Sequence, residues 1–388
     1  MTHIHRTIEK EVLRAARAFP SLLVTGPRRA GKTTLLRKLF PKAAYYLLED
    51  PMLIMRIRED PHAFLENVTT PAIFDEIQNI PELFNYIKAA IDKEPQRKGR
   101  WLITGSQEAP LMKGVSESMA GRVAVFQLLP FSYEETPKVS ALRGGFPEVL
   151  QRPQSSGTWF RSYLQTYLER DVRAISSIRN LAVFRKFLSL LASRAGTLLN
   201  KTDLAAPLGV SVPTITEWLS ILEITGQILI VPPFFENFGK RLIKSPKIYF
   251  TDTGLLCWLL DITRESDLAR GVFAGPVFEN FIASEVVKHQ VHTGKQRQLY
   301  FFRDEQGLEV DFVIPKSNRR LLLLEAKATR TVKPFMAAPI DRLAKSISRY
   351  SLERAVVFQA SRQDKEISDV LSLGVSAVPV NRLFELLR

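Results

Sequence analysis

The stretch SLLVTGPRRAGKTTLL, from Ser21 to Leu36, decides the fold of the amino-terminal part of the chain. Its apolar start predicts a buried strand, and the run from Gly26 to Thr33 fits the spacing G-x-x-x-x-G-K-[ST] at each fixed position. This spacing predicts a phosphate-binding loop, because glycines let the backbone curl until its N–H groups surround a β-phosphate. The predicted cofactor-binding residues are Gly26, Pro27, Arg28, Arg29, Ala30, Gly31, Lys32, Thr33 and Thr34.

Two side chains of the loop have predicted roles of their own. The helix that begins at Lys32 directs its positive end at the phosphates, and the Lys32 ammonium adds a charge for the β- and γ-phosphates, which makes it a catalytic candidate. The Thr33 hydroxyl is a predicted ligand of Mg²⁺, an ion that keeps several waters and needs few protein ligands. ATP and Mg²⁺ are therefore the predicted cofactors. A chance glycine-rich turn before a helix is the alternative.

The sequence AIFDE, residues 72–76, predicts the other half of a nucleotide site. It reads as a short apolar strand that ends in Asp75 and Glu76, roughly forty residues after Lys32. Asp75 is predicted to hold the Mg²⁺ shell beside Thr33, and Glu76 to polarise the water that attacks the γ-phosphate. An acidic strand end that merely faces solvent is the alternative interpretation.

Three further polar residues are candidates for the same site. The apolar strand WLIT, residues 101–104, leads into Ser106, and the ligands of a parallel sheet lie outside the carboxyl ends of its strands. Thr104 and Ser106 are therefore candidate sensors of the γ-phosphate, with a solvent-facing strand end as the alternative. Arg122 precedes another apolar strand and is a candidate transition-state arginine, acting in cis or from a neighbouring subunit. A surface salt bridge is its alternative.

Several motifs together resemble a known group of proteins. GPRRAGKTTLL, AIFDEIQ, LITGSQ, SMAGRVAVFQLLPFSYEE and GGFPEV look like the prokaryotic P-loop ATPases of the AAA-like class that carry a C-terminal domain of unknown function. The resemblance spans most of the chain. It implies a five-stranded αβα ATPase core, in which the loop, Asp75, Glu76 and Ser106 have the roles given above.

The middle of the chain follows the pattern of a helix-turn-helix. In the stretch 199–225, Gly209 stands between two predicted helices, and apolar strands at 228–231 and 247–250 supply a wing. The pattern resembles a winged helix, which the family resemblance also implies. The second helix is not basic, so the domain either reads DNA or packs against protein. The polar residues that would make the DNA contact are Thr214, Thr216 and Glu217.

The C-terminal part carries a nuclease-like constellation. Asp311, followed on the next predicted strand by Glu325 and Lys327, resembles the PD-(D/E)XK nuclease pattern, with Val310 where proline often stands. In that chemistry Asp311 and Glu325 bind Mg²⁺, and Lys327 positions the attacking water or helps to deprotonate it. Glu279, on a preceding helix, is a candidate for completing the metal shell. Simple ion pairing at the end of a buried strand is the alternative.

Composition narrows the class of protein and of partner. With 388 residues, of which 45% are hydrophobic, the chain should form two or three packed domains. The net charge of +14 attracts polyanions without specifying which one, and nucleic acid ranks first unless the basic surface serves only solubility. Among nucleic acids, we expect DNA ahead of RNA. The single cysteine, Cys257, excludes an internal disulfide, and no apolar run matches a bilayer span. We therefore expect a cytoplasmic protein with no membrane partner.

The sequence predicts an α/β fold in four parts. They are a P-loop αβα ATPase core over 1–150, a helical lid or linker over 151–195, a winged helix-turn-helix over 196–265 and a restriction-endonuclease-like mixed α/β domain over 266–388. The predicted function is a Mg²⁺-dependent ATPase coupled to a nucleic-acid-binding domain that is a candidate nuclease. The alternative is an ATP-driven switch that binds a protein partner while its nuclease-like domain is inactive. A homo-oligomer is left open.

Overall fold

The computed structural model forms two compact units. It describes residues 4–106, 119–168, 180–234, 244–317, 319–347, 349–359, 370–372 and 374–388. Unit 1 contains the described residues of Met1–Phe131, Ile224–Gln227 and Val291–Lys295, and unit 2 contains those of Ser132–Glu223, Ile228–Gln290 and Gln296–Arg388. Among the described residues, no helix combines the length and the apolar character that crossing a lipid bilayer requires.

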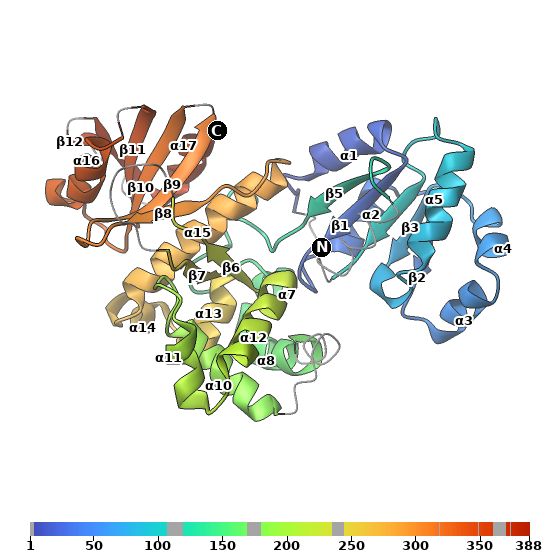
Figure 1. Cartoon of the computed structure of the whole chain (residues 1–388), viewed down its shortest axis with the longest axis horizontal. Coiled ribbons are helices and arrows are strands. Elements are labelled where there is room, and N and C mark those ends of the chain that lie inside the picture. Colours follow the sequence, from blue (N-terminus) through green and yellow to red (C-terminus); the bar gives the residue numbers. More distant parts are fainter. Residues whose placement is uncertain are drawn as a thin grey trace. The chain divides into compact units, whose positions relative to one another are not determined.

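Unit 1 is built on a parallel sheet of five strands, drawn in blue and cyan in Figure 1. The strand order is β2-β3-β4-β1-β5, and every pair of neighbours is parallel. The strands are β1 (Ser21–Thr25), β2 (Ala44–Leu47), β3 (Ala72–Asp75), β4 (Trp101–Thr104) and β5 (Val123–Gln127). The helices are α1 (Glu9–Ala18), α2 (Lys32–Leu39), α3 (Pro51–Glu59), α4 (Pro61–Glu66) and α5 (Leu83–Lys93), with a 3₁₀ turn η1 (Ile77–Asn79).

Strand alternation gives the sheet of unit 1 two apolar faces. On β1, Leu22 and Val24 belong to a core that includes α1 and α2 residues, whereas Leu23 belongs to a second core that includes residues of α3, α4 and α5. Because successive side chains of a strand point to opposite faces, one apolar strand can fill both cores. Helices therefore cover both faces, and the predicted α/β core with a parallel sheet is confirmed.

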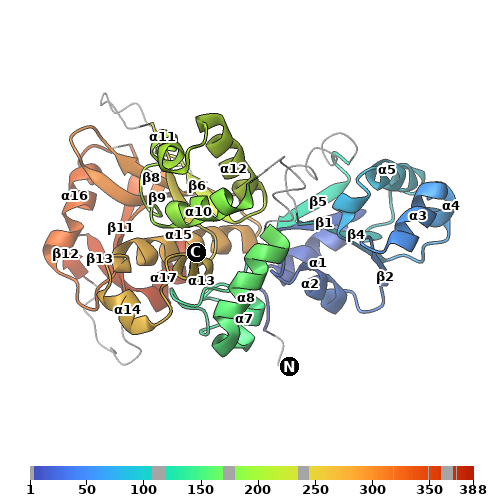
Figure 2. The ribbon, with the colours of Figure 1, turned by 90° about the horizontal axis from the view of Figure 1, so that it is seen from below.

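Unit 2 begins with helices. They are α7 (Pro147–Gln151), α8 (Ser156–Tyr163), α10 (Leu181–Ala192), α11 (Lys201–Ala205), α12 (Val212–Ile224), α13 (Thr253–Leu259), α14 (Glu265–Arg270) and α15 (Ala274–His292), with shorter helical turns η2 (Pro153–Ser155), η3 (Leu164–Leu168) and η4 (Ala206–Leu208). Figure 2 shows α11 and α12 beside α10, and residues of all three share one core. The segment predicted as a helical lid or linker, over 151–195, contains η2, α8, η3 and α10 among its described residues.

Helices α11 and α12 lie on either side of Gly209, in the stretch where the sequence predicts a helix-turn-helix. The Asn200 side chain accepts hydrogen bonds from the backbone N–H groups of Thr202 and Asp203 and so caps α11. Gly209 has a φ of 62°, the left-handed conformation that ends a helix. Two antiparallel strands follow, β6 (Ile228–Val231) and β7 (Lys247–Phe250).

The rest of unit 2 is a mixed sheet of six strands in the order β12-β13-β11-β10-β9-β8. Helix α16 (Ala338–Ala344) packs on one of its faces. The strands are β8 (Tyr300–Arg303), β9 (Glu309–Ser317), β10 (Arg320–Lys327), β11 (Ser351–Phe358), β12 (Val370–Ser372) and β13 (Val375–Pro379). The helical segments are η5 (Pro334–Ala337), α16 (Ala338–Ala344), η6 (Val380–Arg382) and α17 (Leu383–Leu387).

Candidate functional site

The phosphate-binding loop lies at the carboxyl end of β1 and curls around its own lysine. The Lys32 ammonium donates to the carbonyl oxygens of Gly26 and Pro27, at 2.9 and 3.1 Å. Gly26 has a φ of 130°, and a Cβ there would lie 2.1 Å from the carbonyl oxygen of Leu128, so only glycine fits. A bound triphosphate would replace the contacts that Lys32 makes to the loop.

An arginine that the motif does not contain supports the loop. The buried Arg6 guanidinium donates to the Ala30 carbonyl at 3.0 Å and to the Leu129 carbonyl at 2.6 Å, and it lies over the Phe131 ring. Sequence reasoning missed Arg6, because it precedes the motif by about twenty residues and nothing in its neighbourhood marks it. Of the other predicted loop residues, Pro27 and Ala30 are buried, Arg28 and Gly31 are half-buried, and Arg29 and Thr34 are exposed.

Asp75 accepts hydrogen bonds from three hydroxyl groups. Thr33 donates to its carboxylate at 2.8 and 3.0 Å, Tyr45 donates at 2.7 Å, and Thr104 makes a short contact to the same group. The parallel sheet produces this arrangement, because α2, β2, β3 and β4 all place residues at one edge. No local signal in the sequence points to Tyr45, which lies 30 residues before Asp75.

The donor set at this edge fits Mg²⁺. A hydroxyl oxygen of Thr33 and a carboxylate of Asp75 are hard oxygen ligands, and they already lie within hydrogen-bonding distance of one another. Burial, followed by the hydrogen bond to Asp75, raises the pKa of the Tyr45 phenol. Tyr45 therefore remains a proton donor to the carboxylate and keeps it oriented.

Glu76 is held in a strained conformation beside the loop. Its φ of 62° and ψ of 50° are left-handed, which is uncommon for a residue with a Cβ and recurs at functional sites. Its backbone N–H donates to the Thr104 hydroxyl at 3.1 Å, and its carboxylate accepts from the Ser106 hydroxyl at 3.2 Å and makes a short contact with the Gln78 amide. Ser106 is thus brought to the site, and Gln78 joins it unpredicted.

Two cations of the loop face Glu76. The Arg28 guanidinium lies 3.9 Å from its carboxylate and 3.5 Å from that of Glu49. Burial opposes ionisation of Glu76, but Lys32 and Arg28 still hold the pKa of its carboxyl below the ordinary value. Glu76 is therefore an anion at neutral pH and can accept a hydrogen bond from water.

Arg122 is the predicted site residue that the structure does not bring to the loop. It precedes β5, and the first residue of β5, Val123, pairs with Ser21, the first residue of β1. The loop follows the other end of β1, so Arg122 lies at the opposite edge of the parallel sheet. There it forms a two-pronged salt bridge with Asp92, with a shortest distance of 2.6 Å. The structure therefore contradicts a role for Arg122 in cis, which corrects that part of the sequence-based prediction. A role in trans stays a prediction.

Asp311 and Glu325 meet across two strands of unit 2. The register pairs Phe312 of β9 with Leu324 of β10, so the next residues also stand opposite one another. Glu325 accepts from the backbone N–H of Asp311 at 3.3 Å, and Asp311 accepts from the backbone N–H of Ala326 at 2.9 Å. The Lys327 ammonium lies 3.7 Å from the Asp311 carboxylate and closer still to that of Glu325.

Glu279 joins this cluster but contacts different partners from those predicted. Its carboxylate accepts from the Lys247 ammonium at 2.9 Å and from the Tyr249 hydroxyl at 2.6 Å. Burial, followed by the Asp311 charge, raises the pKa of Glu279 to about 7, and the same two causes raise the pKa of Glu325 to about 8. The strand β7 thus contributes two side chains that the nuclease pattern does not include.

This cluster does not fit a metal as it stands. In the part of the chain that the structure describes, no group of three His, Cys, Asp or Glu side chains is arranged to hold a metal ion. The Lys327 ammonium forms ion pairs with the carboxylates of Asp311 and Glu325, and the Lys247 ammonium forms one with Glu279. The predicted metal ligands therefore converge, and lysine ammonium groups lie in contact with them.

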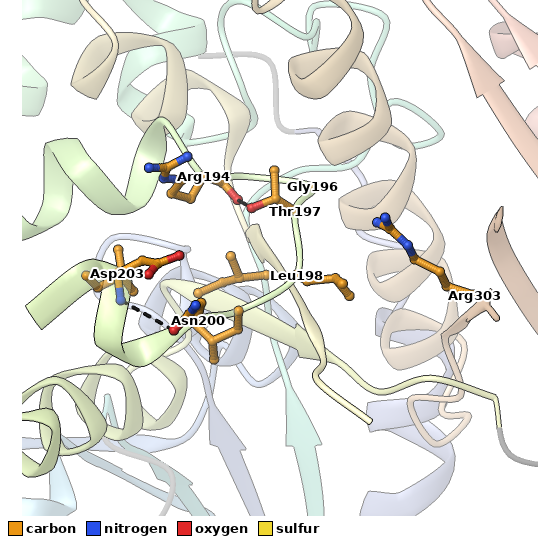
Figure 3. Close-up of a pocket in the computed structure, with 10 residues that line it drawn as sticks. Arg194, Gly196, Thr197, Leu198, Asn200, Asp203 and Arg303 are labelled. Atoms are coloured by element: carbon orange, nitrogen blue, oxygen red, sulfur yellow. Dashed lines mark hydrogen bonds between the residues drawn. The ribbon is translucent and has the colours of Figure 1, made fainter. Parts of the chain in front are cut away.

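A cavity of about 350 Å³ opens next to the cluster. Its wall includes Gly196, where a Cβ would lie 3.5 Å from the Glu279 carboxylate. Figure 3 shows Arg303 on one side of the cavity and Arg194 and Asp203 on the other. The lining residues are Arg194, Gly196, Thr197, Leu198, Leu199, Asn200, Asp203, Leu204, Ile248 and Arg303.

Comparisons with known proteins match the chain in three consecutive stretches. Residues 18–136 match an AAA domain, residues 136–266 match a domain of unknown function (DUF8612) and residues 274–383 match another (DUF4143). The uncharacterized protein Rv2008c of Mycobacterium tuberculosis is 33% identical over 315 residues, which cover 79% of this chain and 70% of that protein.

Two archaeal proteins are more distant. The uncharacterized protein MJ1544 of Methanocaldococcus jannaschii is 21% identical over 368 residues, covering 82% of this chain and 78% of that protein. The solved structure of the Walker-type ATPase PABY2304 of Pyrococcus abyssi is 15% identical, with a TM-score of 0.41, and the match covers 65% of this chain and 94% of that one.

Proposed function

This chain belongs to the family of P-loop ATPases that join an AAA domain to a C-terminal domain of unknown function, and we propose that it hydrolyses ATP with Mg²⁺ and so controls a nucleic-acid-binding unit. The observation that carries the proposal is the convergence of Thr33, Asp75 and Glu76 at the carboxyl edge of one parallel sheet. That edge is where sheets of this class bind their ligands.

Each residue of the site has a role in the proposed reaction. The Lys32 ammonium and the loop N–H groups bind the phosphates, and Thr33 and Asp75 hold Mg²⁺. The metal, when bound, neutralises charge on the β- and γ-phosphates. The Glu76 carboxylate orients the attacking water, and the Ser106 hydroxyl, which already donates to Glu76, senses whether a γ-phosphate is present.

The Mg²⁺ requirement gives the first test. Phosphate release from ATP by the purified chain should depend on Mg²⁺, and Tyr45→Phe should raise the Mg²⁺ concentration for half-maximal rate about fivefold, because Asp75 loses an orienting hydrogen bond worth about 1 kcal/mol. Tyr46→Phe is the matched control on the same strand, since the Tyr46 ring packs against Phe64 and Phe74. Hydrolysis at full rate in EDTA contradicts the proposal.

Nucleic-acid binding by unit 2 rests on charge and on local pattern. The chain carries a net charge of +14, and the helices α11 and α12 together with the β6–β7 pair support the proposal of a winged helix. Of the three side chains predicted to contact DNA, Thr216 and Glu217 are exposed and Thr214 is half-buried. DNA is the proposed ligand, ahead of RNA.

Salt dependence tests this part. Binding of a labelled DNA duplex, followed by fluorescence anisotropy, should weaken at least about tenfold between 50 and 200 mM salt, as expected for a complex held by several phosphate contacts. An RNA duplex of the same sequence is the comparison, and DNA should bind the more tightly of the two. Absence of binding at 50 mM salt, with and without ATP, would remove nucleic acid as the partner.

One observation favours a second candidate function. Lys247, which the nuclease pattern does not include, forms an ion pair with Glu279, the carboxylate predicted to complete the metal shell. In this second candidate the chain is an ATP-driven switch, and its nuclease-like domain binds a protein partner without cutting nucleic acid.

A further inference from the structure

Lys247 is the most completely enclosed cation of the carboxylate cluster. Its side chain is 2% exposed, and its ammonium lies 2.9 Å from the Glu279 carboxylate and 2.6 Å from that of Glu309. An ammonium buried in a strand as apolar as KIYF is tolerated only because carboxylates surround it.

The strand that carries Lys247 also supplies a second contact to the same cluster. Lys247 and Tyr249 are two residues apart on β7, so alternation sends both side chains to one face. Tyr249 donates to Glu279 and its ring lies 5.8 Å from that of Phe312, the neighbour of Asp311 on β9. The Lys247 ammonium also lies 5.6 Å from the centre of the Phe301 ring of β8. These contacts fasten β7 to the six-stranded sheet.

Charge in the cluster is nearly balanced without a metal. Arg303 lies 3.0 Å from the Glu309 carboxylate, and Lys327 serves Asp311 and Glu325. The cluster therefore contains three protein cations and four carboxyl groups. The cations are Lys247, Arg303 and Lys327, and the carboxyl groups are those of Glu279, Glu309, Asp311 and Glu325. A divalent cation bound by Glu279 and Asp311 would bring two more positive charges next to the Lys247 ammonium, and this like-charge contact is unfavourable in a buried site.

We propose that Lys247 is the resident cation of this cluster: its ammonium takes the place that a divalent metal needs, so the cluster fastens β7 to the β8–β9 strands and does not cut nucleic acid. The proposal rests on the nuclease-like interpretation of Asp311, Glu325 and Lys327 and deepens the second candidate function. It does not depend on ATP hydrolysis in unit 1, so a result that overturns one of these two proposals leaves the other unchanged.

Removal of the ammonium should open the site to a metal. The probe is Mn²⁺, whose free concentration is followed by electron paramagnetic resonance on the full chain without nucleotide, in an Asp75→Asn background that disables the phosphate-loop metal site. With Lys247 intact we expect no Mn²⁺ at the cluster. Lys247→Met should bind Mn²⁺ at least about tenfold more tightly, because a buried competing charge is gone. Adding Glu325→Gln should abolish that gain.

A matched control separates this effect from general loosening. Lys288→Met removes another buried lysine, which lies 2.9 Å from the buried Glu285 on the same helix, and it should gain no Mn²⁺. Two results overturn the proposal. One is Mn²⁺ bound with Lys247 intact and lost in Glu325→Gln, and the other is a Lys247→Met chain that unfolds cooperatively yet gains no site. If Lys247→Met does not fold, the Mn²⁺ measurement on the chain with Lys247 intact, with and without Glu325→Gln, tests the proposal by itself.

Cleavage is the second readout. The unaltered chain incubated with plasmid DNA and Mg²⁺ should leave it intact, as should Glu325→Ala. Cutting that Glu325→Ala abolishes shows a working metal site and overturns the proposal. A Lys32→Ala chain should behave the same in this assay, because the cluster lies in unit 2.

Discussion

Lys32→Ala should lower the rate of ATP hydrolysis by at least about a hundredfold, the size of effect expected when a preorganised charge is removed from a reacting phosphoryl group. The Lys32 side chain is buried within its own loop and its ammonium is held by the Gly26 and Pro27 carbonyls, so no other lysine takes its place. Calorimetry should also show loss of the heat of ATP binding.

Lys38→Ala is the control for the first prediction. Lys38 lies on the same helix, α2, but its ammonium is near the surface, 3.2 Å from Glu9. That variant should keep the parental rate. A Lys32→Ala chain that hydrolyses ATP as fast as the parent would falsify the assignment of the loop as the ATP site.

Glu76→Gln should lower kcat by about a hundredfold while ATP still binds, because the amide keeps the size of the side chain but loses the charge that orients water. The anion is maintained by Lys32 and Arg28, which lower the pKa of Glu76. Single-turnover phosphate release and calorimetric affinity measure the two quantities separately.

Glu49→Gln is the matched variant for the second prediction. Glu49 shares the Arg28 guanidinium with Glu76, at 3.5 Å, but it follows β2, whereas the Ser106 hydroxyl donates to Glu76. It should leave kcat within about twofold of the parent, as for a partly exposed ion pair. If Glu76→Gln and Glu49→Gln lower kcat equally, the position of Arg28 sets the rate, and not the activation of water by Glu76.

Much of unit 1 could be predicted because its signals are local. The spacing from Gly26 to Thr33 is contained in eight consecutive positions, and the apolar strand that ends in Asp75 carries its own carboxylate. Parallel strands then place these ends at one edge, which is why Thr33 and Asp75 are in contact. The same reasoning places Asp311 beside Glu325, since alternation and register follow from the strands.

Other contacts depend on distances along the chain that no local pattern encodes. Tyr45 reaches Asp75 from 30 residues away, and Lys247 reaches Glu279 from 32. Neither residue is part of a motif, so the choice between a metal site and a lysine-filled site was open until the strands were assembled. Arg122 is the opposite case. Its place before an apolar strand predicted a role at the nucleotide site, but the structure places it at the edge of the sheet opposite the phosphate-binding loop, which argues against a role in cis.

The phosphate loop, the acidic strand end and the α/β class follow from local sequence, because backbone curvature and strand alternation are properties of neighbouring residues. Which cation faces which carboxylate does not follow from any local pattern. That choice depends on burial and on side chains brought together from separate elements, as Lys247 and Glu279 are, and those are properties of the packed molecule alone.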